Sequence, residues 1–245
     1  MTDFNRDSVI KPGNFGTFYA ADTRRGEFDR FNEALLMEGV RPDALFIGDS
    51  LMHYWELAAH FSDKGKVVIN RGIGGDISTA VHRRFEADAL QLKPRLIVMC
   101  IGANDLGWDI LALTEAAMDT VCENVAAMVD MANDAGIPIA IGSLPPMWRP
   151  FWHTAEFTTK KIGMLVDTNK RLKPIVEDRG AIWIDHHSAL VDENGEMRHE
   201  LADDGVHPTA AGYAIMARVL KETLATAGIT ALGYRERLYL PINCP

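Results

Sequence analysis

Cysteine is scarce in this chain of 245 residues, and long apolar runs are missing. The three cysteines, Cys100, Cys122 and Cys244, are an odd number for a disulfide framework, and no two of them form a C-x-x-C pair. No segment approaches the ~18 consecutive apolar residues of a membrane span, and residues 1–11 lack the apolar core of a secretory signal. We therefore expect a cytoplasmic protein in a reducing compartment, with no membrane span.

Positive charge is in the minority. Lys and Arg number 25 against 34 Asp and Glu, which gives a formal net charge of -9. Such a balance repels nucleic acid and anionic membrane surfaces on average, so we expect neither as a partner. Hydrophobic residues make up 47% of the chain, and this fraction supports an ordinary globular core.

The sequence has no complete metal or dinucleotide motif. His199-Glu200 begins like H-E-x-x-H, but Asp203 stands where the second histidine belongs. We interpret Asp185-His186-His187 as an exposed loop, because the triplet lacks a spaced third ligand. The glycines of Gly72–Asp76 are followed by Ile77 where a dinucleotide fingerprint has its third glycine. We therefore expect neither a metal nor a cofactor, and a nucleotide-binding oxidoreductase is the weakest of the hypotheses.

We predict a single domain over residues 1–245. No internal repeat, low-complexity tract or linker rich in Pro, Gly or Ser divides the chain. The core is expected at about 44–226, after an N-terminal extension at 1–43. The C-terminal tail, 227–245, has no clear period, so it either packs over the domain or meets a partner, as in a homo-oligomer.

Five apolar runs are predicted to be strands, because they are continuous, as is typical of a parallel sheet covered on both faces. These runs are Ala44–Ile47, Val67–Ile69, Arg95–Ile101, Ile137–Ile141 and Ala181–Ile184. Helical periodicity covers Phe28–Met37, Ile77–Leu90, Thr114–Asn133, Thr158–Glu177 and Pro208–Thr226, the last with proline in its first turn. The alternation predicts an α/β fold, a three-layer α/β/α sandwich around a five-stranded parallel sheet.

Small and polar residues follow the first three predicted strands, and a further polar block precedes the last helix. The blocks are Gly48–Leu51, Arg71–Asp76, Gly102–Asp105 and Asp203–Pro208. In open parallel sheets, ligands bind beyond the carboxyl ends of the strands. A serine, a histidine and an aspartate are therefore expected together at one rim of the sheet.

Ser50, His207 and Asp204 suit nucleophilic catalysis. A serine hydroxyl needs a base within hydrogen-bond reach, and that base needs an orienting group. The three-residue offset from Asp204 to His207 lets the carboxylate reach the imidazole, although Asp203 is an adjacent rival. Donors for a developing oxyanion are available in the backbone N–H of Ser50, the Gly74-Gly75 turn and the side chain of Asn104.

The four blocks, in this order, resemble those of the SGNH hydrolases in the GDSL esterase/lipase superfamily. The family's four letters match Ser50, Gly75, Asn104 and His207, and the resemblance runs from about Ala44 to Leu224. By contrast, the elbow Gly-x-Ser-x-Gly of α/β-hydrolases needs glycine at position 52, where this chain has Met52.

This resemblance implies roles for the matching residues. Ser50 would be the nucleophile, His207 the general base and then acid, and Asp204 its orienting carboxylate. The oxyanion donors would be the Ser50 N–H, the Gly75 N–H and the Asn104 amide. The family fold is a flavodoxin-like sandwich. The glycine block resembles most the branch of platelet-activating-factor acetylhydrolase subunits and bacterial carbohydrate acetylesterases, which implies short acyl groups.

A loop rich in aromatic residues, 143–157, is expected on the same rim as Ser50. Trp148, Arg149 and Trp152 either form a wall of the substrate pocket or belong to a packed lid or subunit contact. Trp108 and Asp49 complete the candidate substrate-binding residues.

We therefore expect a cofactor-free serine esterase that acts through an acyl-enzyme on short acyl esters, with O-acetyl esters of carbohydrates among its substrates. An acyl thioesterase and a lysophospholipase are alternatives within the class. A binding protein that kept the fold but not the chemistry is the alternative outside it, and the intact set of Ser50, Asn104, Asp204 and His207 argues against that alternative.

Overall fold

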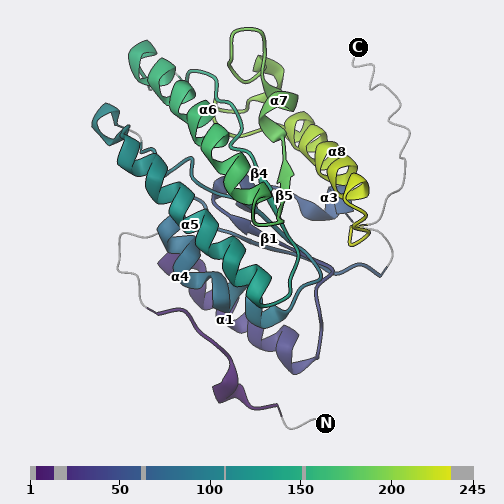
Figure 1. Cartoon of the computed structure of the whole chain (residues 1–245). Helices are drawn as coiled ribbons and strands as arrows, with labels where there is room; N and C mark the ends of the chain where they lie inside the picture. The colour runs from purple at the N-terminus through teal and green to yellow at the C-terminus, as the bar shows by residue number, and fades with distance from the viewer. Residues whose placement is uncertain (1–3, 14–20, 62–64, 108, 151–152, 233–245) are drawn as a thin grey trace.

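The computed structural model describes residues 4–13, 21–61, 65–107, 109–150 and 153–232, and the core is a parallel sheet between layers of helices (Figure 1). The strands are β1 Ala44–Gly48, β2 Val68–Gly72, β3 Ile97–Cys100, β4 Ile139–Gly142 and β5 Ile182–Ile184. All neighbours pair in parallel, in the order β2-β1-β3-β4-β5. This is the strand order of flavodoxin-like folds, so the predicted α/β three-layer fold is confirmed.

Strand β1 shows why the apolar runs are continuous. All five of its residues are buried. Phe46 packs into the apolar cluster on one face of the sheet, and its neighbour Ile47 packs into the cluster on the other face. Successive side chains of a strand point to opposite faces, so a strand covered on both sides has no position for a polar residue.

The helices divide between the two faces (Figure 1). One face is covered by α1 Ala21–Met37, α4 Ser78–Asp88 and α5 Glu115–Asp134. The other carries α2 Ser50–His53, α3 Leu57–Phe61, α7 His186–Leu190 and α8 Ala210–Thr226. Helix α6, Ala155–Glu177, packs beside α5 and β5 and contributes to both clusters. Single 3-10 turns lie at Arg6–Ser8, Leu90–Leu92, Ile110–Ala112 and His199–Leu201. Because both clusters pack on one sheet, we propose that the described residues form one domain.

Several local predictions are wrong. The first helix, predicted at Phe28–Met37, begins at Ala21. Helix α8 begins at Ala210, because the hydroxyl of Thr209 accepts the N–H of Gly212 as its N-cap, while Pro208 pairs with Ala202 in an isolated bridge. The triplet at 185–187 is not an exposed loop: Asp185 caps α7, and His186 is fully buried. A carboxylate ahead of a short helix is a capping signal that the sequence interpretation overlooked.

The strand order places a topological switch between β1 and β3. From these two neighbouring strands the chain continues in opposite directions along the sheet, which leaves a crevice at their carboxyl ends. The loops after β1, β2 and β3 meet at this crevice.

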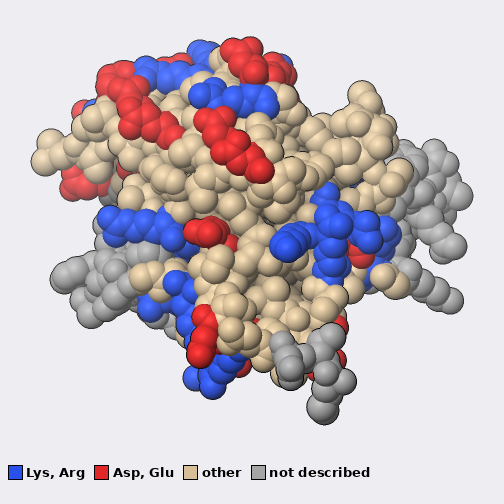
Figure 2. All heavy atoms as spheres, turned by 60° about the horizontal axis from the view of Figure 1, so that its bottom comes forward, with Lys and Arg blue, Asp and Glu red and all other residues tan. Residues whose placement is uncertain are grey.

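The face shown in Figure 2 carries basic and acidic side chains in mixed groups, with uncharged areas between the groups. Among the described residues, no helix has the length and apolar character that a membrane crossing requires.

Candidate active site

Ser50 stands at the point where β1 gives way to α2. Gly48 ends the strand with φ +151°, and a Cβ there would lie 2.0 Å from the carbonyl oxygen of Cys100, so only glycine fits. Asp49 caps α2, its Oδ1 accepting the N–H of Leu51 at 2.9 Å. Ser50 is therefore the first residue of the helix and is 8% exposed.

His207 reaches Ser50 across 157 residues of sequence. Its Nε2 lies 2.8 Å from the Ser50 Oγ, and its Nδ1 lies 2.7 Å from Oδ2 of Asp204. The ring of His207 also meets that of Tyr54, the C-cap of α2, in an edge-to-face contact with the ring centres 5.1 Å apart. The three polar groups form a continuous hydrogen-bonded chain from hydroxyl to carboxylate.

Asp204, and not Asp203, holds the imidazole. Its Oδ1 accepts the backbone N–H groups of Val206 and His207 at 3.0 and 2.9 Å, which leaves Oδ2 for the ring. Burial raises the pKa of Asp204, but the hydrogen bonds from His207 and Val206 outweigh burial and lower it below its usual value. The carboxylate is therefore ionised at neutral pH and favours a proton on Nδ1, which leaves Nε2 to accept one.

The glycine turn after β2 offers one backbone donor to the site. The N–H of Gly74 donates to Nδ1 of His53 at 3.0 Å, so it is already used. Gly75 has φ +81° as the third residue of the turn Ile73–Asp76, which the Asp76 N–H closes on the Ile73 carbonyl. Within the described chain, the N–H of Gly75 donates to no protein acceptor. Of the two glycines in the turn, it is therefore Gly75 whose N–H is available to a ligand.

Asn104 follows β3 and is held by the same turn. Its Nδ2 donates to the carbonyl oxygen of Asp76 at 2.9 Å. An amide nitrogen carries two hydrogens, so this bond fixes the side chain and leaves a second N–H for another acceptor. Asp105 links the loop after β3 to the start of α4, because its carboxylate accepts the N–H and the hydroxyl of Ser78.

These groups open into a common cavity of about 400 Å³. Its lining residues are Arg24, Ser50, His53, Tyr54, Ile73, Gly74, Gly75, Asn104 and His207. Four of the five residues expected at the reaction centre line it, and the fifth, Asp204, stands behind His207. A hydroxyl, a base with its carboxylate, and two N–H donors around one space are the components of acyl transfer.

A buried ion network supports the loops from behind. Arg84 on α4 is fully buried, and its guanidinium pairs with Asp76 at 2.9 Å and with Asp88 at 3.2 Å. The same group donates to the carbonyl oxygens of Arg71 and Gly48, the residues near the ends of β2 and β1. One side chain therefore ties the nucleophile turn to the glycine turn.

Asp49, expected among the substrate-binding residues, does not line the cavity that contains Ser50. Its side chain is fully buried, and its Oδ2 has no hydrogen-bond partner. Burial raises the pKa of Asp49 to about 7, helped by the nearby carboxylates of Asp76 and Asp105. Lys161, also buried, is the facing cation; burial lowers its pKa to about 7 against the opposing effect of Asp49, and its Nζ donates to the Gly107 carbonyl at 2.6 Å.

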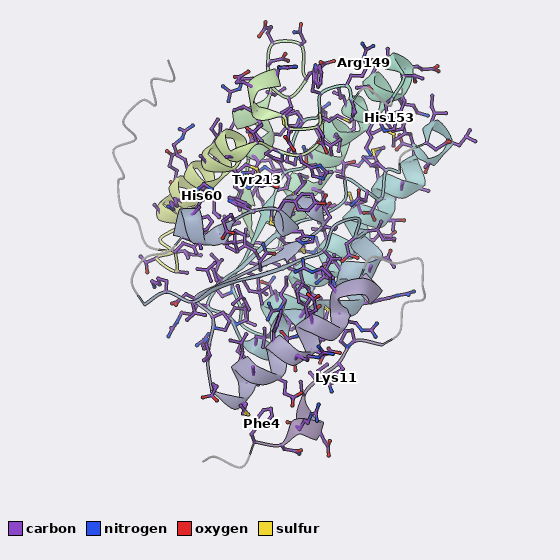
Figure 3. All side chains as sticks on the ribbon, turned by 180° about the vertical axis from the view of Figure 1, so that it is seen from behind. Phe4, Lys11, His60, Arg149, His153 and Tyr213 are labelled. Carbon is purple, nitrogen blue, oxygen red and sulfur yellow. The ribbon has the colours of Figure 1, made fainter. Side chains whose placement is uncertain are left out.

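Trp148 and Arg149 line a neighbouring cavity of about 630 Å³ rather than the one that contains Ser50. That cavity adjoins the loop of His207 through Asp203 and Asp204, and the backbone N–H of Trp148 donates to the carbonyl of Gly205 at 2.7 Å. Figure 3 shows Arg149 and His153 in the upper part of the molecule and Tyr213 nearer its centre. The other two aromatic candidates, Trp108 and Trp152, lie outside the described residues.

Sequence reasoning missed four residues of this site: Arg24, His53, Tyr54 and Arg84. Arg84 had a signal, because it is a charged residue on the buried face of α4 together with Ala80 and Val81. His53 lies one helical turn after Ser50, a spacing that is informative only once the short helix α2 is known. Arg24 had no signal in the sequence, since it precedes every one of the four polar blocks. Among the described residues, no group of three potential ligands forms a metal site.

Comparison with known proteins identifies the type of domain. The sequence model of the GDSL-like Lipase/Acylhydrolase family matches residues 46–215. A curated relative, an acetylxylan esterase from Geobacillus stearothermophilus, is 25% identical over 165 residues, which cover 66% of this chain and 74% of the relative.

Solved structures repeat the fold. One from Streptococcus pneumonia, described as a platelet activating factor, superposes with a TM-score of 0.71 at 22% identity and covers 84% of this chain and 94% of its own. A GDSL-like lipase from Bacteroides thetaiotaomicron gives a TM-score of 0.67 at 24% identity, covering 82% and 97%.

Proposed function

The chain belongs to the GDSL-like lipase/acylhydrolase family and is an ester-hydrolysing serine hydrolase; we propose that it cleaves short acyl esters through an acyl-enzyme formed on Ser50. The observation that carries this proposal is the hydrogen-bonded chain from Ser50 through His207 to Asp204, which opens on a cavity with oxyanion donors.

In the first step the Ser50 Oγ attacks the ester carbonyl carbon while its proton passes to Nε2 of His207, 2.8 Å away. Asp204 stabilises the imidazolium through the hydrogen bond to Nδ1. The C–O bond to the alcohol then breaks, and the alkoxide takes the proton from Nε2 as it leaves. Ser50 is left acylated.

Negative charge develops on the carbonyl oxygen in this step. The Ser50 N–H at the start of α2, the Gly75 N–H and the second N–H of Asn104 are the donors for it. Because the surrounding turns already fix these groups, they need little reorganisation when the charge appears.

Deacylation repeats the chemistry with water. Water attacks the acyl carbon and gives a proton to Nε2 of His207, which returns it to the Ser50 Oγ as the C–O bond breaks. The products are the carboxylic acid and the free serine, so the reaction consumes one water and needs no cofactor.

The lining of the cavity supports a short acyl group. Ile73 is the one aliphatic side chain among the described lining residues, and the remainder are glycines or carry polar atoms. A long acyl chain requires an apolar wall that these residues do not provide. Because the curated relative is an acetylxylan esterase, we propose O-acetyl esters, those of carbohydrates included, as the substrate class.

The test is steady-state hydrolysis of p-nitrophenyl acetate, butyrate and decanoate, with an acetyl thioester as a further arm. Acetate should be cleaved fastest. Ser50→Ala should lower kcat by a factor of roughly 10⁴ to 10⁶, because the nucleophile is removed while the fold keeps its contacts.

Ser188→Ala is the matched control, since Ser188 lies on α7 and bonds to Asp185 outside the catalytic cavity. A preference for decanoate would favour a lysophospholipase, and preferential thioester cleavage would favour a thioesterase. If wild-type protein cleaves none of these substrates and Ser50 does not react with a fluorophosphonate probe, a binding protein is the better interpretation.

A further inference from the structure

Arg24 brings a cation to the catalytic cavity from outside the segment that defines the family. It lies on α1, Ala21–Met37, whereas the family match begins at residue 46. Arg24 nevertheless lines the same cavity as Ser50, Gly75 and Asn104. The N-terminal extension of the sequence therefore supplies part of the wall around the reaction centre.

The guanidinium of Arg24 is held in place. Nη1 donates to the carbonyl of Gly72 at 3.0 Å, and the guanidinium carbon lies 5.0 Å from the centre of the buried Phe28 ring. The arginine side chain is 29% exposed. Because Gly72 is the last residue of β2, this bond fixes the cation directly before the turn that carries Gly75.

Arg24 keeps donors for a ligand. Within the part of the chain that the structure describes, its Nη2 has no hydrogen-bond partner. Among the described residues, the carboxylate that pairs with Arg24 is that of Glu27, which is 3.7 Å from Nε and 54% exposed. An exposed pair at this distance neutralises little of the charge, since water screens it.

The charge lining the cavity has the opposite sign to the net charge of the whole chain. The protein carries a net charge of -9, yet none of the described residues lining the catalytic cavity is an aspartate or glutamate. The charge of Arg24 reaches this space: after burial, it is the next cause that lowers the pKa of His53. A neutral His53 accepts the Gly74 N–H, so Arg24 remains the permanent cation among these residues.

We propose that Arg24 forms an anion subsite that selects esters bearing a carboxylate, beside the oxyanion hole and distinct from it. Two N–H groups of one guanidinium match the two oxygens of a carboxylate, and a fixed guanidinium loses little freedom on binding. The carboxylate lies on either the acyl chain or the alcohol of the substrate. This inference rests on the proposed ester hydrolysis.

Two matched substrate pairs test the subsite. p-Nitrophenyl propanoate and mono-p-nitrophenyl succinate differ by a carboxylate on the acyl part, and phenyl acetate and 4-acetoxybenzoate differ by one on the alcohol part. For wild-type protein and Arg24→Gln, kcat/KM is measured on all four. In the variant, the ratio of anionic to neutral substrate should fall roughly tenfold or more in one pair, mainly through KM.

Arg30→Gln is the control, because Arg30 is exposed on the same helix, its loss changes the net charge equally, and it does not line the cavity. It should leave both ratios within about twofold of wild type, a window well below the tenfold effect sought. Added salt should reduce the anionic preference of the wild type and of Arg30→Gln, but not of Arg24→Gln.

Three results overturn the inference. Equal losses on anionic and neutral esters would make Arg24 a support for the Gly72 turn only. Unchanged ratios in both pairs would show that no carboxylate meets Arg24. If wild-type protein hydrolyses none of the four esters, the proposed function fails as well; hydrolysis of the neutral esters separates the two failures.

Discussion

At the scale of single residues, the site depends on which N–H groups are already used. Gly74 and Gly75 are adjacent and chemically identical, yet the N–H of the first donates to His53 and that of the second has no acceptor among the described residues. Asp203 and Asp204 are also adjacent residues with different contacts, since only Asp204 bonds to the ring of His207. The family resemblance selected Gly75, and spacing selected Asp204. The physical reason for Gly75 is a contact between the glycine turn and α2, the bond from Gly74 to His53, and the reason for Asp204 is its set of bonds to Val206 and His207 within one loop.

Asn104 is the residue whose loss should separate catalysis from binding. Its free N–H meets charge that develops only in the transition state, so Asn104→Ala should lower kcat by roughly 10²- to 10³-fold with little change in KM. Asn124→Ala is the control, because Asn124 bonds to Ser78 and Thr79 and lies outside the cavity. An effect of Asn104→Ala confined to KM on p-nitrophenyl acetate would remove Asn104 from the oxyanion hole.

At the scale of elements, the ends of β1 and β2 depend on one arginine of α4. Arg84 donates to the carbonyls of Gly48 and Arg71 and pairs with Asp76, whose own carbonyl holds Asn104. The positions of Ser50, Gly75 and Asn104 are thus coupled through a side chain that touches none of the reacting atoms. We therefore propose that Arg84 is a positioning residue.

Replacing Arg84 should damage both stability and turnover. Arg84→Met leaves Asp76 and Asp88 as buried carboxylates without their cation, which should cost about 3–5 kcal/mol of unfolding free energy in urea. Arg84→Lys keeps the charge but lacks the fork that reaches four acceptors, so it should fold and show a lower kcat with KM nearly unchanged.

Arg83→Lys is the control, since Arg83 is the exposed neighbour on the same helix. If Arg84→Lys has wild-type kcat, or if its loss is entirely in KM, Arg84 does not position the oxyanion donors.

At the scale of the whole molecule, the sequence predicts the sheet well and the support of the site poorly. The five strands were predictable because continuous apolar runs have few other uses in a chain of this composition. Helix α2 was not predictable, because four residues carry no periodicity. The burial of His186 on α7 was not predictable either, because a polar residue in a short helix gives no sign of its burial. Arg24 escaped for another reason: only the packing of α1 brings it to β2.

The buried carboxyl of Asp49 makes global stability depend on pH. In the folded state burial raises its pKa from 3.8 to about 7, and Asp76, Asp105 and Lys161 face it, with Lys161 acting in the opposite direction. Between these two pKa values the folded state binds the proton that the unfolded state has released. Stability from this group is therefore complete below pH 4 and is lost as pH rises toward 7.

Asp49→Asn should remove this dependence. Asparagine keeps an oxygen to accept the Leu51 N–H and is itself a good N-cap, so the start of α2 is preserved. A shift of about three pKa units, at about 1.36 kcal/mol each, sets an upper limit of about 4 kcal/mol on the change in unfolding free energy with pH. In urea unfolding, the free energy of unfolding of wild type should therefore fall relative to that of the variant as the pH is raised from 5 to 8. A difference that stays constant over this range would mean that Asp49 is ionised in the fold throughout, held by Lys161, and that the buried pair rather than a neutral acid supports the nucleophile turn.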